Sequence, residues 1–237
     1  MKKYVADSLS FGNLLCGVAS IAASSRGSFE LAMILVFVGA LLDGLDGAAA
    51  RVFGGTRFGV IADDLADGVT YGIAPGAALY FLLSGVEGLA LGVTYASFTI
   101  CRLVFFTLNK GKGDPNYFAG VPSPTGGAIV MSTIVSLGAY PALVGLLVGA
   151  ACTFMISFDT AYRHLGRLLA YRRKALLYIM PVYVILSVVA YMFGLRFLVA
   201  AILAANLGYA LFPVATHFRD ALRDPPPDDL VKSEDVA

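Results

Sequence analysis

Long apolar segments, repeated along most of the chain, constrain this fold more than any other feature. Eight of them approach the roughly 20 residues that a helix needs to cross a bilayer core of about 30 Å. They cover residues 5–23, 28–50, 60–83, 87–108, 124–138, 141–158, 175–194 and 196–216. The fifth and sixth are short and separated only around Gly138 and Pro141, so six or seven spans are also compatible. Because 58% of the 237 residues are hydrophobic and only 14% are charged, the sequence predicts an all-α, polytopic membrane bundle.

The distribution of Lys and Arg between the ends of these segments indicates an orientation. With eight spans and the N-terminus inside, 14 basic residues fall in inside segments, and only Arg26 and Arg196 fall outside. Cytoplasmic loops of membrane proteins carry an excess of Lys and Arg. We therefore expect both termini in the cytoplasm and an even number of spans.

Composition excludes some classes of protein and divides the chain. The balance of 17 basic and 16 acidic residues argues against a strongly basic nucleic-acid binder. The three cysteines lie in apolar runs without metal or redox spacing, so we interpret them as buried hydrophobes. After residue 219 the sequence turns polar and contains three consecutive prolines. We predict a membrane domain at 1–219 and a disordered cytoplasmic tail at 220–237.

Acidic residues, which are costly inside membrane helices and usually functional there, gather at the facing ends of the second and third segments. Asp43 and Asp46 are three positions apart, and Asp63 and Asp67 are four apart, so each pair shares one helical face. A short glycine-containing turn joins the two antiparallel helices, so four carboxylates can converge. Their mutual repulsion is relieved by one or two divalent cations, and all-oxygen ligation favours Mg²⁺, Mn²⁺ or Ca²⁺. Asp64 points about 100° away and is not placed with them.

Small residues line the approach to these acids. Gly47, Ala50 and Gly59 thin the helix walls beside the carboxylates. Close packing of helices would explain such residues equally well in isolation. Beside four carboxylates, we interpret them as room for a bulky phosphorylated ligand. Arg51 would then contact an anion at the membrane surface; the alternative is an arginine that sets topology or binds a lipid headgroup.

The pattern of these residues resembles the signature of the CDP-alcohol phosphatidyltransferases. In this chain it is Asp43-x2-Asp46-Gly47-x2-Ala50-Arg51, followed by Gly59-x3-Asp63-x3-Asp67. Seven residues separate its two halves, where the family usually has eight or more, and the difference falls in the glycine-containing turn. Over roughly residues 8–160 the chain is most similar to the bacterial phosphatidylserine synthases. Three further segments carry this similarity: Asn13-Leu14-Leu15-Cys16-Gly17, Asp67 to Pro75, and Tyr117 to Pro124.

This resemblance implies a transfer reaction at the cytoplasmic side of the inner membrane. The hydroxyl of L-serine would attack the β-phosphorus of CDP-diacylglycerol and release phosphatidylserine and CMP. Mg²⁺ or Mn²⁺ would be held by the four aspartates of the signature, and Asp67 would also serve as the base. The same resemblance implies nucleotide or lipid-phosphate binding by Gly47, Ala50, Arg51, Gly59 and Asn13. Membrane lipids are the expected surroundings, and a homodimer is expected by analogy.

The resemblance also places an acceptor pocket near the loop at 109–124, with Pro122 and Ser123 as candidates. Arg102, near the inner end of the fourth segment, is a third candidate because it could contact a lipid phosphate or the serine carboxylate. The alternative for Arg102 is snorkelling of its side chain to the membrane interface. A basic stretch at 163–174 indicates inside orientation and attraction to anionic lipid.

Three alternatives remain open at this point. The same reaction could use another acceptor, such as glycerol phosphate, inositol phosphate or choline. Residues 63–67 also match DDxxD, the diphosphate motif of prenyltransferases, which would release pyrophosphate rather than CMP. Carboxylates in a membrane bundle can also carry protons or metal in a transporter, although transport sites lie near mid-membrane and these acids lie at one edge.

Overall fold

The computed structural model describes residues 4–109, 117–163 and 194–223, which are predominantly helical. The helices are α1 (Tyr4–Ser25), α2 (Phe29–Phe53), α3 (Arg57–Asp67), the π-helix η1 (Gly68–Ile73), α4 (Ala74–Leu83), α5 (Gly85–Leu108), α6 (Ser123–Leu137), α7 (Pro141–Ile156) and α10 (Leu195–Arg223). Two short strands, β1 (Tyr117–Ala119) and β2 (Ala161–Arg163), pair antiparallel.

The predicted apolar segments correspond to these helices. Four helical stretches are long and apolar enough to cross a membrane: Tyr4–Ser25, Phe29–Phe53, Gly85–Leu108 and Leu195–Pro213. The predicted segment 60–83 is built from α3, η1 and α4 in direct succession. The break between the fifth and sixth segments is confirmed, because α6 ends at Leu137 and α7 begins at Pro141, which cannot continue a preceding helix. The predicted segment 175–194 lies outside the described residues, apart from its last position.

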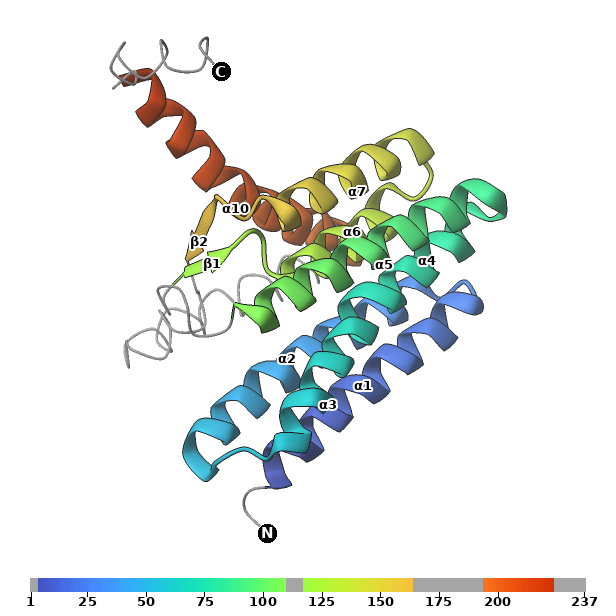
Figure 1. Ribbon diagram of the computed structural model, residues 1–237. Coiled ribbons are helices and arrows are strands. Elements are labelled where there is room, and N and C mark those ends of the chain that lie inside the picture. The colour runs from blue at the N-terminus through green and yellow to red at the C-terminus, as the bar shows by residue number, and fades with distance from the viewer. Residues whose placement is uncertain (1–3, 110–116, 164–193, 224–237) are drawn as a thin grey trace.

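The helices lie side by side, and their connections alternate between the two ends of the bundle (Figure 1). The turns α1–α2, α4–α5 and α6–α7 gather at one end, and the α2–α3 turn and the β1–β2 pair lie at the other. Arg196 lines a cavity of about 480 Å³ together with Gly27 and Ser28 of the α1–α2 turn. Arg26 belongs to that turn as well, so the two arginines expected on the same side do share one end of the bundle.

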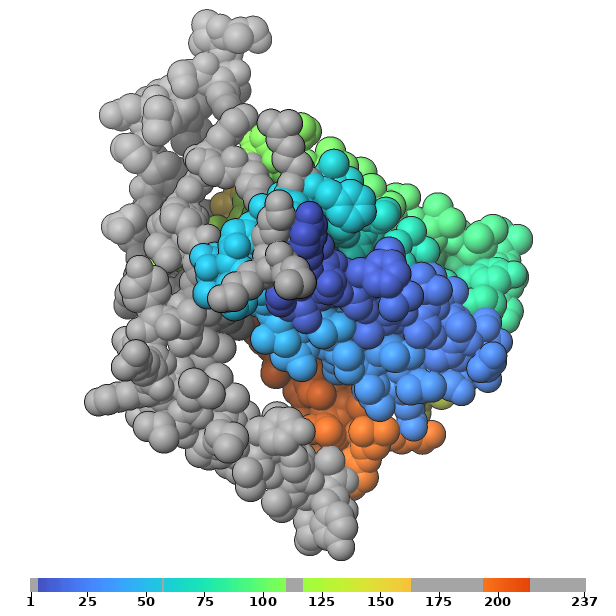
Figure 2. Space-filling model, turned by 90° about the horizontal axis from the view of Figure 1, so that it is seen from below, coloured from blue at the N-terminus to red at the C-terminus, as the bar shows by residue number. Residues whose placement is uncertain are grey.

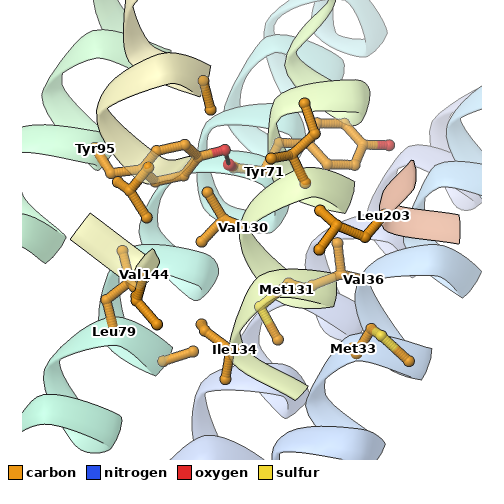
Figure 3. Packing of buried hydrophobic residues seen from close by; sticks show 14 of the residues in the cluster. Met33, Val36, Tyr71, Leu79, Tyr95, Val130, Met131, Ile134, Val144 and Leu203 are labelled. Carbon is orange, nitrogen blue, oxygen red and sulfur yellow. Dashed lines mark hydrogen bonds between the residues drawn. The ribbon is translucent and has the colours of Figure 1, made fainter. Parts of the chain in front are cut away.

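The core of the bundle is centred on α6. Its residues from Gly126 to Ile134 are all buried, as expected for a helix that is apolar on every face. Figure 3 shows Val130, Met131 and Ile134 of α6 among side chains from the surrounding helices, with Tyr71 and Tyr95 at one end of the cluster. The two tyrosines bring hydroxyl groups into this interior, close to where the acidic residues lie.

Glycines allow α4 and α5 to approach closely. A Cβ added to Gly76 would lie 2.7 Å from the carbonyl oxygen of Gly92, and one added to Gly92 would overlap the carbonyl oxygen of Gly76. Small residues permit this kind of backbone contact between membrane helices. This contact fixes α5 against the helical run that carries Asp63 and Asp67.

The described residues form a helical bundle, as predicted, with one short strand pair: β1 and β2 pair through Phe118 and Tyr162. Strands of three residues are too short to show a period-two pattern. β1 lies within the predicted loop at 109–124, and α6 begins at Ser123 before that loop was expected to end. The predicted tail at 220–237 begins inside α10, which continues to Arg223, and the residues after 223 lie outside the described range, as do 164–174 of the basic stretch.

Candidate metal centre

The turn between α2 and α3 brings the two acidic helix ends together. Gly54 follows α2 with a φ of +81°, a conformation that glycine adopts without strain. The Thr56 hydroxyl accepts a hydrogen bond from the Gly59 N–H (2.8 Å) and donates one to Asp7 Oδ2 on α1 (2.8 Å), so it caps α3 and ties the turn to α1. Figure 2 shows this end of the molecule, with the start of α1 beside the α2–α3 connection.

Three carboxylates converge between α2 and α3. Asp43, Asp46 and Asp63 each offer an oxygen, and these oxygens all lie within 4.8 Å of one another. Asp46 is buried, and the other two are half-buried. Negative charges this close repel each other strongly when water is excluded, and a divalent cation removes that repulsion. The all-oxygen donor set fits Mg²⁺, Mn²⁺ or Ca²⁺.

Asp43, Asp46 and Asp67 each accept a hydrogen bond from a neutral side chain of another element. Ser10 Oγ on α1 donates to Asp46 Oδ2 (2.7 Å), and the Tyr71 hydroxyl donates to Asp43 Oδ2 (3.2 Å). Asn13 Nδ2, also on α1, donates to Asp67 Oδ1 (3.2 Å). Such contacts orient carboxylates without adding charge, as the outer partners of metal ligands commonly do.

Ser10 and Tyr71 are functional candidates that the sequence analysis missed. For Ser10 a signal was available, because Ser10, Asn13 and Gly17 are spaced i, i+3 and i+7 on one buried face of α1. For Tyr71 the signal was weak, since it lies in a π-helix rather than in an α-helical continuation of α3. π-Helical turns are rare and recur at functional sites.

The π-helix η1 is anchored on both sides. Thr70 Oγ1 donates to the Asn13 carbonyl oxygen on α1 (3.0 Å), and the Tyr95 hydroxyl on α5 donates to the Tyr71 carbonyl oxygen (2.9 Å). The second of these bonds is drawn in Figure 3. Because both neighbours hold η1 in place, the Tyr71 hydroxyl stays directed at Asp43.

Asp67 and Asp64 are not among the three aspartates whose oxygens cluster. Asp67 lies one turn after Asp63, and its Oδ1 accepts the hydrogen bond from Asn13 Nδ2. Asp64 is directed elsewhere: its Oδ2 accepts a hydrogen bond from Thr107 on α5 (3.2 Å). This agrees with the 100° offset expected from helix geometry.

The small residues of the motif differ in their surroundings. A Cβ at Gly59 would overlap Asp7 Oδ1 and lie 3.2 Å from the Thr56 hydroxyl, so Gly59 is needed for packing of α3 against α1. At Gly47 the nearest atom to such a Cβ is Arg51 Nη1, at 3.6 Å, which leaves room beside the carboxylates. Ala50 is half-buried, and Arg51 is exposed in the last turn of α2.

The three acceptor-pocket candidates lie together. Arg102 on α5 is only 4% exposed, and its Nη1 donates to Ser123 Oγ at 2.8 Å. Ser123 is the first residue of α6, and Pro122 precedes it with a ψ of 143° that starts the helix. The snorkelling alternative for Arg102 is wrong, because the guanidinium is held inside the bundle by α6.

The CDP-alcohol phosphatidyltransferase profile matches residues 3–157, which include every element of this acidic site. The chain belongs to the CDP-alcohol phosphatidyltransferase family. Among its relatives is the CDP-diacylglycerol–serine O-phosphatidyltransferase of Helicobacter pylori, 34% identical over 137 residues, or 56% of this chain and 58% of that protein. The Bacillus subtilis protein of the same name is 30% identical over 149 residues, covering 60% of this chain and 81% of the relative.

An archaeal relative extends the match slightly further along the chain. The archaetidylserine synthase of Methanothermobacter thermautotrophicus is 30% identical over 161 residues, covering 66% of this chain and 68% of that protein. The matched part spans less than two thirds of the H. pylori relative. The three clustered aspartates are consistent with the divalent-metal binding that is typical of this family.

Proposed function

We propose that this protein transfers the phosphatidyl group of CDP-diacylglycerol to L-serine, forming phosphatidylserine and CMP. One observation carries the proposal: the oxygens of Asp43, Asp46 and Asp63 meet within 4.8 Å inside the segment that matches the family profile. The serine acceptor is supported by relatives named for serine transfer at 30–34% identity.

In this proposal Asp43, Asp46 and Asp63, together with Asp67, would hold Mg²⁺ or Mn²⁺. A cation bound there would neutralise the charge that develops on the diphosphate as CMP leaves. Asp67 accepts the proton of the serine hydroxyl as its oxygen bonds to the β-phosphorus and the bond to CMP breaks. Asn13, by donating to Asp67 Oδ1, sets the orientation of that carboxylate.

The nucleotide and the lipid phosphate occupy the approach lined by the small residues of the motif. The open space at Gly47 and the exposure of Arg51 support contact with a phosphate there, with Ala50 on the same helix. We assign Gly59 and Asn13 to the wall of this site, since Gly59 packs on Asp7 and Asn13 contacts Asp67.

We further propose that the bundle spans the inner membrane eight times with both termini and the metal centre facing the cytoplasm. The support is the 14-to-2 distribution of basic residues together with the shared end of Arg26 and Arg196. This placement leaves the acyl chains of the donor in lipid, and it lets serine and the nucleotide exchange with water. A homodimer remains an expectation from the resemblance.

A panel of acceptors tests the proposal. Purified protein in detergent receives CDP-diacylglycerol with Mg²⁺ or Mn²⁺ and, in turn, serine, glycerol phosphate, inositol phosphate or choline, while CMP release and the lipid product are measured. We expect CMP and phosphatidylserine with serine alone. Turnover with another alcohol would overturn the serine assignment, pyrophosphate release would favour prenyl transfer, and metal flux in proteoliposomes without lipid turnover would favour transport.

A variant of the metal centre tests the chemistry separately. We expect Asp43→Asn to abolish CMP release, because the neutral amide cannot replace a carboxylate ligand. The variant should remain folded, as judged by its elution from size-exclusion chromatography. Substantial residual activity would contradict a metal site at the three aspartates.

A further inference from the structure

A cavity of about 350 Å³ lies between the α3–η1 run and α5, which lies beside it (Figure 1). Of the described residues that line this α3–α5 cavity, Asp64 and Thr107 have polar side chains, and the others are Gly68 and large apolar residues such as Ile100. The three clustered aspartates are not among these lining residues. The cavity therefore opens on a different face of α3 from the candidate metal centre, as expected from the 100° between Asp63 and Asp64.

The polar and apolar parts of the α3–α5 cavity are ordered along α5. Thr107 lies one residue before the end of this helix, which is long and apolar enough to cross a membrane, and its hydroxyl donates to Asp64 Oδ2 at 3.2 Å. Ile100 comes seven residues earlier, about 10 Å further from that end at 1.5 Å per residue. This order matches one leaflet of a bilayer, in which the headgroup lies at the surface and the acyl chain runs roughly 15 Å to the midplane.

Asp64 gives the polar end of the cavity a negative charge. Its carboxylate is half-buried and accepts a hydrogen bond from the uncharged hydroxyl of Thr107. None of the described residues that line the cavity is basic. An ionised carboxylate at a membrane helix is costly unless it meets a cation or hydrogen-bond donors. The same charge repels the diphosphate of a CDP-linked lipid, so the cavity suits a lipid with a different headgroup.

We propose that the α3–α5 cavity binds a zwitterionic membrane phospholipid whose headgroup ends in a primary ammonium, as in phosphatidylethanolamine. The ammonium donates a charge-assisted hydrogen bond to Asp64, and one acyl chain lies along the apolar wall toward Ile100. The quaternary ammonium of phosphatidylcholine has no N–H to donate. The anionic headgroup of phosphatidylglycerol is repelled by the carboxylate. This site is outside the metal centre and does not depend on which alcohol the enzyme uses.

Quenching of a single tryptophan by brominated lipids tests this selection, because the chain contains no tryptophan of its own. Ile100→Trp, at the apolar end of the cavity, is purified and placed in vesicles of phosphatidylcholine mixed with phosphatidylethanolamine, phosphatidylglycerol or phosphatidylserine. In each mixture one lipid carries bromine near the middle of its acyl chains, and the loss of fluorescence gives its binding constant relative to phosphatidylcholine. Leu15→Trp, at an exposed position of α1 outside the cavity, reports the ordinary lipid boundary and is the matched control.

We expect Ile100→Trp to bind phosphatidylethanolamine about two- to fivefold more tightly than phosphatidylcholine, the strength of an ion pair in a partly solvated place. Both anionic lipids should bind more weakly than phosphatidylcholine, and Leu15→Trp should not distinguish the lipids. Adding Asp64→Asn should bring the ratio to one. Adding Glu87→Gln, which removes a charge from the exposed first turn of the same helix, should leave it unchanged.

Three results would overturn the proposal. The first is equal binding of phosphatidylethanolamine and phosphatidylcholine at Ile100→Trp, and the second is the same preference at Leu15→Trp. The third is preference for an anionic lipid, which would assign the cavity to a headgroup of the opposite charge. Because lipid binding is measured without CDP-diacylglycerol or serine, a failure of the proposed serine transfer leaves the test unaffected.

A headgroup series covers the case in which Asp64→Asn does not fold. Ile100→Trp is measured with phosphatidylethanolamine that carries successive N-methyl groups, which remove N–H donors stepwise but keep the net charge and the acyl chains. We expect the binding constant to fall along the series, and a constant value would contradict a hydrogen bond from the ammonium. Thr107→Val keeps the carboxylate and should keep the preference for phosphatidylethanolamine. Loss of the preference in folded Thr107→Val would assign the selection to the hydroxyl and overturn the role of Asp64.

Discussion

Replacement of Ser10 by alanine tests whether the carboxylates are held in place by their neutral donors. The Ser10 hydroxyl donates to Asp46 Oδ2 at 2.7 Å, and both residues are buried, at 3% and 4% exposure. A hydrogen bond to a charged group contributes about 1.5–3 kcal/mol. Loss of a partner that orients a metal-binding carboxylate commonly lowers metal affinity about 10- to 100-fold. We therefore expect Ser10→Ala to weaken apparent Mg²⁺ affinity by a factor in this range.

The assay has two independent measurements and a control on the same helix. The Mg²⁺ or Mn²⁺ dependence of CMP release gives an apparent affinity, and isothermal titration of Mn²⁺ into the purified protein gives a direct one. Ser8→Ala makes the same chemical change two residues away, where the hydroxyl is exposed and donates to the Tyr4 carbonyl oxygen. It should leave both affinities unchanged.

Comparison of the metal affinities of these variants decides whether the Ser10–Asp46 hydrogen bond orients a metal ligand. Ser10→Thr keeps a hydroxyl at the position and should retain more metal affinity than Ser10→Ala. If Ser10→Ala binds metal within about twofold of wild type, well inside the expected range, then the contact with Asp46 does not orient a metal ligand. Equal losses in Ser10→Ala and Ser8→Ala would point to a general effect on α1.

Three further predictions concern packing and metal dependence. Gly59→Ala brings a methyl group into Asp7 Oδ1 and should lower the free energy of unfolding by about 1–3 kcal/mol. Adding Asp7→Ala to this variant should restore most of that loss, and equal unfolding midpoints for the single and double variants would refute the contact. Gly92→Ala pushes against the Gly76 carbonyl oxygen and should lower the thermal midpoint, whereas Gly149→Ala, with open space around it, should stabilise by up to about 1 kcal/mol. A strong chelator should stop CMP release, and added Mg²⁺ or Mn²⁺ should restore it; full activity in the chelator would exclude the metal site.

Most of the helical framework followed from local features of the sequence. A helix that crosses lipid must be apolar over a length set by the bilayer, so runs of hydrophobic residues mark its bounds within a few positions. Pro141 marked the start of α7 for a similarly local reason, since proline cannot continue the preceding helix. The pairing of β1 with β2 joins residues more than forty positions apart, and nothing near either strand indicated its partner.

In the acidic site, too, some features followed from local sequence and others depended on distant residues. Helical spacing alone placed Asp43 with Asp46, and the short turn placed Asp63 opposite them, as the structure has it. The donors that hold these groups come from distant positions: Ser10 precedes Asp46 by 36 residues, and Tyr71 follows Asp43 by 28. The enclosure of Arg102 likewise depends on its contact with Ser123, 21 residues away.

The sequence by itself determined which segments are helices and which carboxylates share a face, because both depend on the fixed rise and rotation of one helix. Tertiary structure alone decided which neutral side chains orient the carboxylates and that the guanidinium of Arg102 is enclosed. Those outcomes depend on how separate helices pack, and the spacing of residues within one helix carries no information about the rotation of its neighbour.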